Sequence, residues 1–69
     1  MFRLNVPMIL RLLAERRLSI RQFALASGLH ELTARKAVTD GATISMKTLG
    51  AIAQYFAVDA DALIMKGDE

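Results

Sequence analysis

The sequence predicts an all-α fold, a compact bundle of about five short helices. Two observations predict this fold: apolar residues recur at helical spacing along most of the chain, and residues that begin or end helices occur at short intervals. A third observation limits the number of domains, because 69 residues are enough for only one. This domain is predicted over residues 1–69, with its core over about 6–64. Small aliphatic side chains must fill that core, or a second subunit must cover the surplus, because aromatic residues are few.

The first residues depart from the helical pattern. Residues 2–6 alternate apolar and polar side chains, which is typical of a half-buried strand, so a short N-terminal β-strand is expected. Two further arrangements stay open, namely a frayed end that packs on the monomer and a strand that pairs between two subunits. Pro7 suits the first turn of a helix, where its missing N–H costs nothing. The apolar stripe that follows predicts the first helix over about 7–17.

The second helix carries the clearest local signals. Ser19 and Gln22 match a capping box, in which the serine hydroxyl accepts from the backbone N–H of Gln22 and the glutamine side chain reaches back. Gly28 ends the helix, because glycine adopts the left-handed conformation without a Cβ penalty. The third helix is predicted over 31–40, with His30 as a poor N-cap and Gly41 closing it.

The C-terminal part is predicted as a loop and two helices. Residues 42–44 form the loop, and Ser45 caps a fourth helix that ends at residues 57–58. Asp59 is expected to cap a last short helix that runs through Ile64.

The second and third helices, joined through Gly28, have the pattern of a helix-turn-helix. Ala24 lies four residues before the glycine, and the inward side of the third helix is small as well, with Ala34, Ala37 and Val38. Small side chains allow the two helices to pack closely. The polar side of the third helix is then left projecting, as entry into a DNA major groove about 12 Å wide requires.

The charge distribution agrees with a polyanionic partner, although the net charge is only +2. Up to Lys47 the chain has eight bases against three acids, and after it one base against four acids. The alternative is scattered, solvated charge. The chain has no cysteine, one histidine and no pair of carboxylates in an apolar setting. We therefore expect no bound metal, no cofactor and no enzymatic activity. Pro7 and Arg11 flank a short apolar run, which argues against a signal peptide or membrane helix and favours a cytoplasmic protein.

Three segments together resemble a known family. "LSIRQFALASGL", "TARKAVTDG" and "ISMKTLGAIAQYFAVDADAL" are similar, in this order and spacing, to the Cro/cI-type (lambda-repressor-like, XRE) helix-turn-helix domain. The resemblance covers about residues 6–64 and implies a sequence-specific regulator of transcription that binds double-stranded DNA, usually as a dimer. By position, it implies two sets of contacts. Base contacts fall on Glu31, Leu32, Thr33, Arg35 and Lys36, and phosphate contacts on Ser19, Arg21, Gln22, Thr39, Thr43, Ser45 and Lys47.

Other interpretations of these residues stay open. Glu31 stands where the family often has glutamine, and phosphates repel a carboxylate unless it accepts from cytosine N4. Glu31 and Arg35 also fit an ordinary i,i+4 ion pair. The helix-turn-helix is also compatible with a second function, in which it binds another protein as an antitoxin-like or accessory subunit. A homodimer is expected to use either the N-terminal strand or the last helix with residues 63–65.

Overall fold

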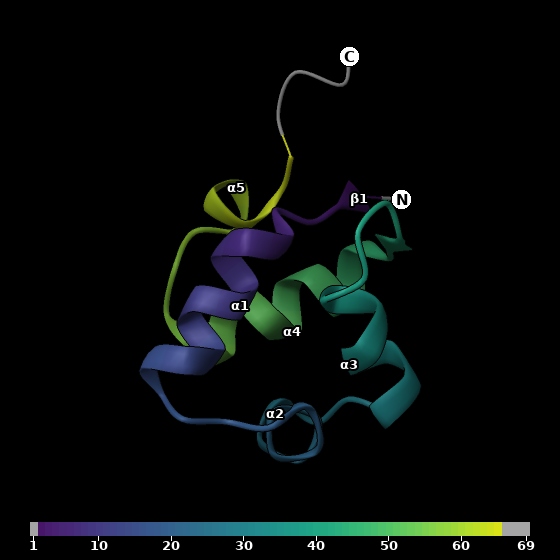
Figure 1. Cartoon of the computed structure of the whole chain (residues 1–69). Coiled ribbons are helices and arrows are strands. Elements are labelled where there is room, and N and C mark those ends of the chain that lie inside the picture. The colour runs from purple at the N-terminus through teal and green to yellow at the C-terminus, as the bar shows by residue number, and fades with distance from the viewer. Residues whose placement is uncertain (1, 66–69) are drawn as a thin grey trace.

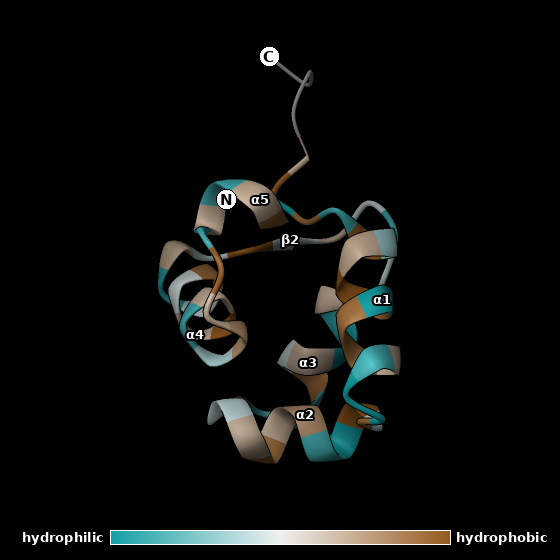
Figure 2. Ribbon diagram, turned by 90° about the vertical axis from the view of Figure 1, so that its left-hand side faces the viewer, coloured by the Kyte–Doolittle hydropathy of each residue, from teal (hydrophilic) through white to brown (hydrophobic). Residues whose placement is uncertain are grey.

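The computed structural model describes residues 2–65 and shows a mostly helical molecule with a small antiparallel sheet (Figure 1). The predicted fold of five helices with an N-terminal strand is confirmed over those residues. In chain order, the elements of residues 2–65 are β1 (Phe2–Arg3), α1 (Val6–Glu15), α2 (Ile20–Ser27), α3 (Glu31–Ala37), β2 (Thr43–Ile44), α4 (Met46–Phe56) and α5 (Ala60–Leu63). Figure 1 and Figure 2 both place α2 at the end of the molecule opposite α5.

The N-terminal strand has a hydrogen-bonded partner on each side. One side of β1 pairs antiparallel with β2. On the other side Leu4 forms an isolated antiparallel bridge with Ile64, and the N–H of Met65 donates to the Arg3 carbonyl at 2.8 Å. Both sides of the strand are therefore used within one copy of the chain, which disfavours a strand pair between two subunits at this place.

Two predictions for this region were wrong in extent. The strand does not reach Val6, because Asn5 is the N-cap of α1 and its Oδ1 accepts from the N–H of Met8 at 3.4 Å. Residues 43–44, predicted as part of a loop, form β2. The partner strand of β2 is distant in the sequence, so no local pattern announces the pairing.

The first helix begins at Val6 and ends at Glu15, which corrects the predicted span of 7–17. Arg17 has a left-handed backbone with φ of 55°. The N–H of Leu18 donates to the Leu13 carbonyl at 2.9 Å, which is the closing bond of a Schellman motif. Glycine usually takes the left-handed position of this motif, and an arginine there gives no stop signal in the sequence.

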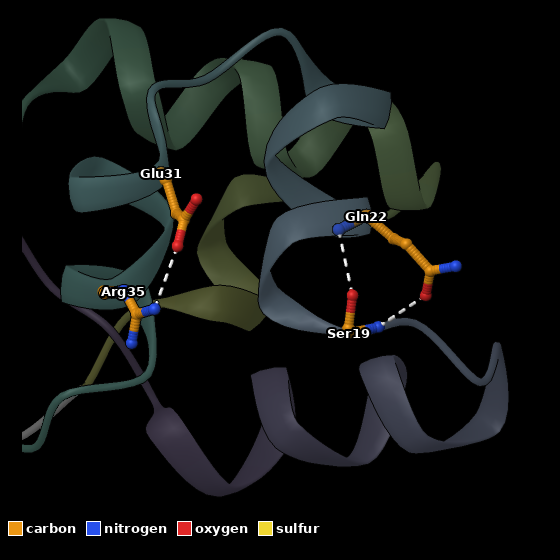
Figure 3. A network of polar contacts seen from close by, with 4 residues as sticks. All are labelled: Ser19, Gln22, Glu31 and Arg35. Atoms are coloured by element: carbon orange, nitrogen blue, oxygen red, sulfur yellow. Dashed lines mark hydrogen bonds and ion pairs between the residues drawn. The ribbon is translucent and has the colours of Figure 1, made fainter.

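The second helix confirms its predicted signals at both ends. Oγ of Ser19 accepts from the N–H of Gln22 at 3.1 Å, and the N–H of Ser19 donates to Oε1 of Gln22 at 2.8 Å (Figure 3). Gly28 is left-handed, with φ of 73° and ψ of 27°. The N–H of Leu29 donates to the Ala24 carbonyl at 2.8 Å and completes the turn.

The third helix is shorter than predicted and ends at Ala37 rather than at Asp40. The hydroxyl of Thr39 donates to the Arg35 carbonyl at 2.7 Å, and this side-chain bond replaces the backbone bond that a longer helix would make. Gly41 follows with φ of 82° and turns the chain toward β2. His30 makes no side-chain hydrogen bond as N-cap.

The fourth helix has the predicted ends. Oγ of Ser45 accepts from the N–H of Thr48 at 3.2 Å, and Ala57 ends the helix in the left-handed conformation, with φ of 57°. The last helix differs in one respect. Asp59 occupies its N-cap position but makes no side-chain cap bond, so that predicted bond is absent. The helix ends at Leu63, because Ile64 is extended and pairs with the N-terminal segment.

One hydrophobic cluster joins all the helices. Its largest fully buried side chains are Phe23, Ile9, Ile52 and Leu63. The buried members are Leu4, Ile9, Leu13, Phe23, Ala24, Ala34, Ala37, Ile44, Leu49, Ile52, Ala53, Phe56 and Leu63. The rings of Phe23 and Phe56 stack with centroids 5.6 Å apart, which fixes α2 on α4.

Candidate nucleic-acid interface

The packing of α3 on α2 depends on alanines. Ala34 and Ala37 on α3 are fully buried, and Ala24 on α2 is 3% exposed. Because these side chains end at Cβ, the helices pack closely and only one side of α3 is covered. The other side leaves Glu31, Leu32, Arg35 and Lys36 exposed.

The exposed side of α3 carries an ion pair beside a solvent-facing leucine. Nη2 of Arg35 donates to Oε2 of Glu31 at 2.9 Å, one turn away on the same helix (Figure 3). The side chains remain 62% and 48% exposed, so the predicted i,i+4 pair is confirmed and both groups stay accessible. Leu32 is 75% exposed and belongs to no part of the core.

A shallow hollow of about 210 Å³ joins α3 to the start of α4. Lys36 supplies a cation to it, and four hydroxyl-bearing residues line the rest together with Ile44: Thr33, Thr43, Ser45 and Thr48. The hollow therefore presents one ammonium group and several hydroxyls, which are the groups that contact phosphate oxygens in protein–DNA complexes. Thr33 and Lys36, expected at bases, thus lie in the same hollow as Thr43 and Ser45, expected at phosphates.

The other expected phosphate contacts lie on the surface at helix starts and in one turn. Ser19, Arg21 and Gln22 are exposed at the start of α2, with the first and third joined in the capping box. Lys47 is exposed in the first turn of α4. Thr39 is exposed after α3, and its hydroxyl is already bonded to the helix.

A family model for the Cro/C1-type HTH DNA-binding domain matches residues 8–64. The chain belongs to this family. The search of curated proteins and the search of solved structures found no match to this chain. The Cro/C1-type assignment makes DNA the expected partner, and domains of this family are typically not enzymes.

Two residues that line the hollow, Ile44 and Thr48, were not among the expected DNA contacts, and of these only Thr48 is polar. Its hydroxyl lies 3.1 Å from Oγ of Ser45, the cap of α4. The signal for it was the spacing itself, because a residue three positions after an N-cap lies beside that cap. In this Cro/C1-type domain the same geometry brings Thr48 next to the groups expected at phosphates.

Within residues 2–65, no group of three or more histidines and carboxylates is arranged to hold a metal ion. Over the same range, no helix has both the length and the apolar character that a membrane crossing needs.

Proposed function

We propose that this protein is a sequence-specific transcriptional regulator that inserts α3 into the major groove of double-stranded DNA. In this proposal residues 1–69 act as one DNA-binding domain, and the protein meets DNA in the cytoplasm. The exposed outer side of α3 carries the proposal. An alanine-packed helix with two exposed basic side chains, in a chain of the Cro/C1-type family, has the shape and charge that a groove-reading element needs.

The proposed contacts follow the two sides of this surface. Bases are contacted from the outer side of α3, and phosphates from the starts of α2 and α4 and from the turn between α3 and α4. The base set is Glu31, Leu32, Thr33, Arg35 and Lys36, and the phosphate set is Ser19, Arg21, Gln22, Thr39, Thr43, Ser45 and Lys47. Thr33 and Lys36 line the hollow together with the hydroxyls of Thr43, Ser45 and Thr48. This shared lining supports contacts of Thr33 and Lys36 with phosphates as well as with bases.

A fluorescence anisotropy titration with labelled random-sequence duplex DNA tests the proposal. Affinity should be measurable at low salt and fall steeply as salt rises, because bound phosphates release counterions. Arg35→Ala and Lys36→Ala should each weaken binding. Arg11→Ala is a matched control, because Arg11 is also exposed and also forms an i,i+4 ion pair, with Glu15 at 3.3 Å, but lies on α1. Unchanged affinity in both α3 variants would remove this helix from the interface.

A homodimer is part of the proposal. A reading helix of seven residues reaches few base pairs, and a two-fold dimer doubles the site. Of the expected surface at residues 63–65, Leu63 is fully buried and Ile64 pairs with Leu4, which corrects that expectation. Met65, 48% exposed, is the residue of that surface that remains for a dimer contact. Sedimentation equilibrium should show a dimer that Met65→Lys dissociates, while Met46→Lys on α4 leaves it intact. Selected DNA sites should be palindromic.

A second function, docking of another protein, has one observation in its favour. Leu25 on α2 and Met46 on α4 are 75% and 74% exposed, so two large apolar side chains outside the proposed DNA contacts face solvent. This function predicts no salt-dependent DNA binding in the same titration. It also predicts capture of a protein from nuclease-treated lysate that Leu25→Ser abolishes.

A further inference from the structure

The first two residues of α3 carry side chains that DNA phosphates do not attract. The carboxylate of Glu31 is half exposed and is repelled by phosphate, and the exposed side chain of Leu32 can form neither a hydrogen bond nor an ion pair. The cationic groups, Arg35 and Lys36, follow one turn later on the same helix. The beginning of α3 is therefore suited to base edges, while its second turn supplies attraction to the polyanion.

The ion pair makes Glu31 a usable acceptor near DNA. Its Oε2 accepts from Nη2 of Arg35, and the nearby guanidinium partly offsets the negative charge of the carboxylate. A carboxylate accepts several hydrogen bonds, so capacity remains for a donor on a base. The major groove offers two donors, N4 of cytosine and N6 of adenine. Adenine has the acceptor N7 beside its amino group, whose lone pair repels a carboxylate, whereas cytosine has only C–H there. Cytosine is the better match.

Leu32 matches a different group. The apolar group that bases present in the major groove is the 5-methyl of thymine. Leu32 is free to cover it, because the side chain is 75% exposed and is not needed by the core. Residues 31 and 32 are neighbours on the helix, which rises 1.5 Å per residue, so they reach the same or adjoining base pairs.

We propose that Glu31 and Leu32 make α3 select a cytosine and a thymine in neighbouring base pairs. Glu31 accepts from N4 of the cytosine, and Leu32 covers the 5-methyl of the thymine. This inference rests on the proposed function and names the DNA sequence class that the interface recognises. In this arrangement Arg35 and Lys36 contribute affinity together with the phosphate contacts, whereas Glu31 lowers affinity for every other base and thereby provides discrimination.

The test begins with selection of bound duplexes from a random pool by the full-length wild-type chain. The selected sites should contain a cytosine and a thymine in adjacent base pairs. Glu31→Gln should change the preferred base at the first position from cytosine to adenine, because glutamine pairs with adenine N6 and N7. The same variant should also bind random DNA more tightly, because it removes a negative charge that the polyanionic DNA repels.

Thymine-to-uracil replacement in the selected site tests Leu32 without changing the protein. It removes one methyl group from the DNA. Wild-type binding should weaken about fourfold, which is the change in affinity expected when one buried methyl group is lost. Leu32→Ala should bind the thymine and uracil sites equally.

The possible outcomes distinguish a failure of this inference from a failure of the proposed DNA-binding function. Selected sites without the cytosine and thymine, or a Glu31→Gln variant with an unchanged base preference, would overturn the inference while the DNA-binding function stands. A protein that enriches no duplex at all would overturn the proposed function itself.

Discussion

Replacing Gly28 by alanine isolates the backbone geometry on which the orientation of α3 depends. Gly28 is left-handed, and a Cβ built on it meets no atom within 4 Å. The cost of Gly28→Ala is therefore conformational rather than steric. A left-handed L-residue costs about 1–2 kcal/mol, offset in part by the lower chain entropy that alanine gives the unfolded state, so a net loss of about 1 kcal/mol is expected.

Gly50 provides a matched control for the same chemical change. It lies within α4, is exposed, and also has no atom within 4 Å of an added Cβ. Alanine is better than glycine by about 1 kcal/mol inside a helix, so Gly50→Ala should stabilise the protein. The two substitutions are thus expected to change the free energy of unfolding in opposite directions, with a difference of about 2 kcal/mol between them.

Thermal unfolding followed by circular dichroism measures both effects. For a domain of this size 1 kcal/mol corresponds to about 4–8 °C in Tm, so Gly28→Ala should melt lower and Gly50→Ala higher than wild type by about that amount. Gly28→Asn should lose less than Gly28→Ala, because asparagine tolerates the left-handed conformation better. A Gly28→Ala protein that melts at or above the wild-type temperature would refute the reasoning.

Three further stability predictions use the same measurement. Ser19→Ala removes the capping box with Gln22 and should cost about 1 kcal/mol, whereas an unchanged Tm would show that the box contributes nothing. Ala34→Leu adds volume at a fully buried position between α3 and the core and should cost about 1–3 kcal/mol; a stabilised variant would contradict the close packing described above. Arg16→Met removes the hydrogen bond to the Phe56 carbonyl and a guanidinium 5.0 Å from the Phe56 ring, for a loss of about 0.5–1 kcal/mol; a gain in Tm would mean that these contacts do not tie α1 to α4.

Local chemistry explains which parts of the fold were predictable. The capping box at Ser19, the cap at Ser45 and the left-handed turn at Gly28 each involve residues within a few positions of one another, and all three are confirmed. The ends of α1 and α3 were wrong. At the end of α1, Arg17 has a left-handed backbone, which is not expected for an arginine. At the end of α3, the Thr39 hydroxyl bonds to the Arg35 carbonyl, which a longer helix would use for a backbone bond.

Contacts between distant segments explain the rest. The pairing of β1 with β2 joins residues far apart in the sequence, and periodicity within one segment cannot show it. For the same reason the sequence separated Thr33 and Lys36 from Thr43 and Ser45, although the structure places all four around one hollow. The exposure of Glu31 and Arg35 was predictable, because helical spacing alone puts them on the side of α3 away from its alanines.

The most direct test of the central claim, that α3 and its neighbouring helix starts form the DNA-binding surface, is a titration of ¹⁵N-labelled protein with a selected duplex, followed by NMR. The largest amide shift changes should fall on residues 31–37 and 43–48, with smaller changes at the start of α2 and little change along α1. Large changes confined to α1 and α5, with the amides of α3 unmoved, would contradict the account.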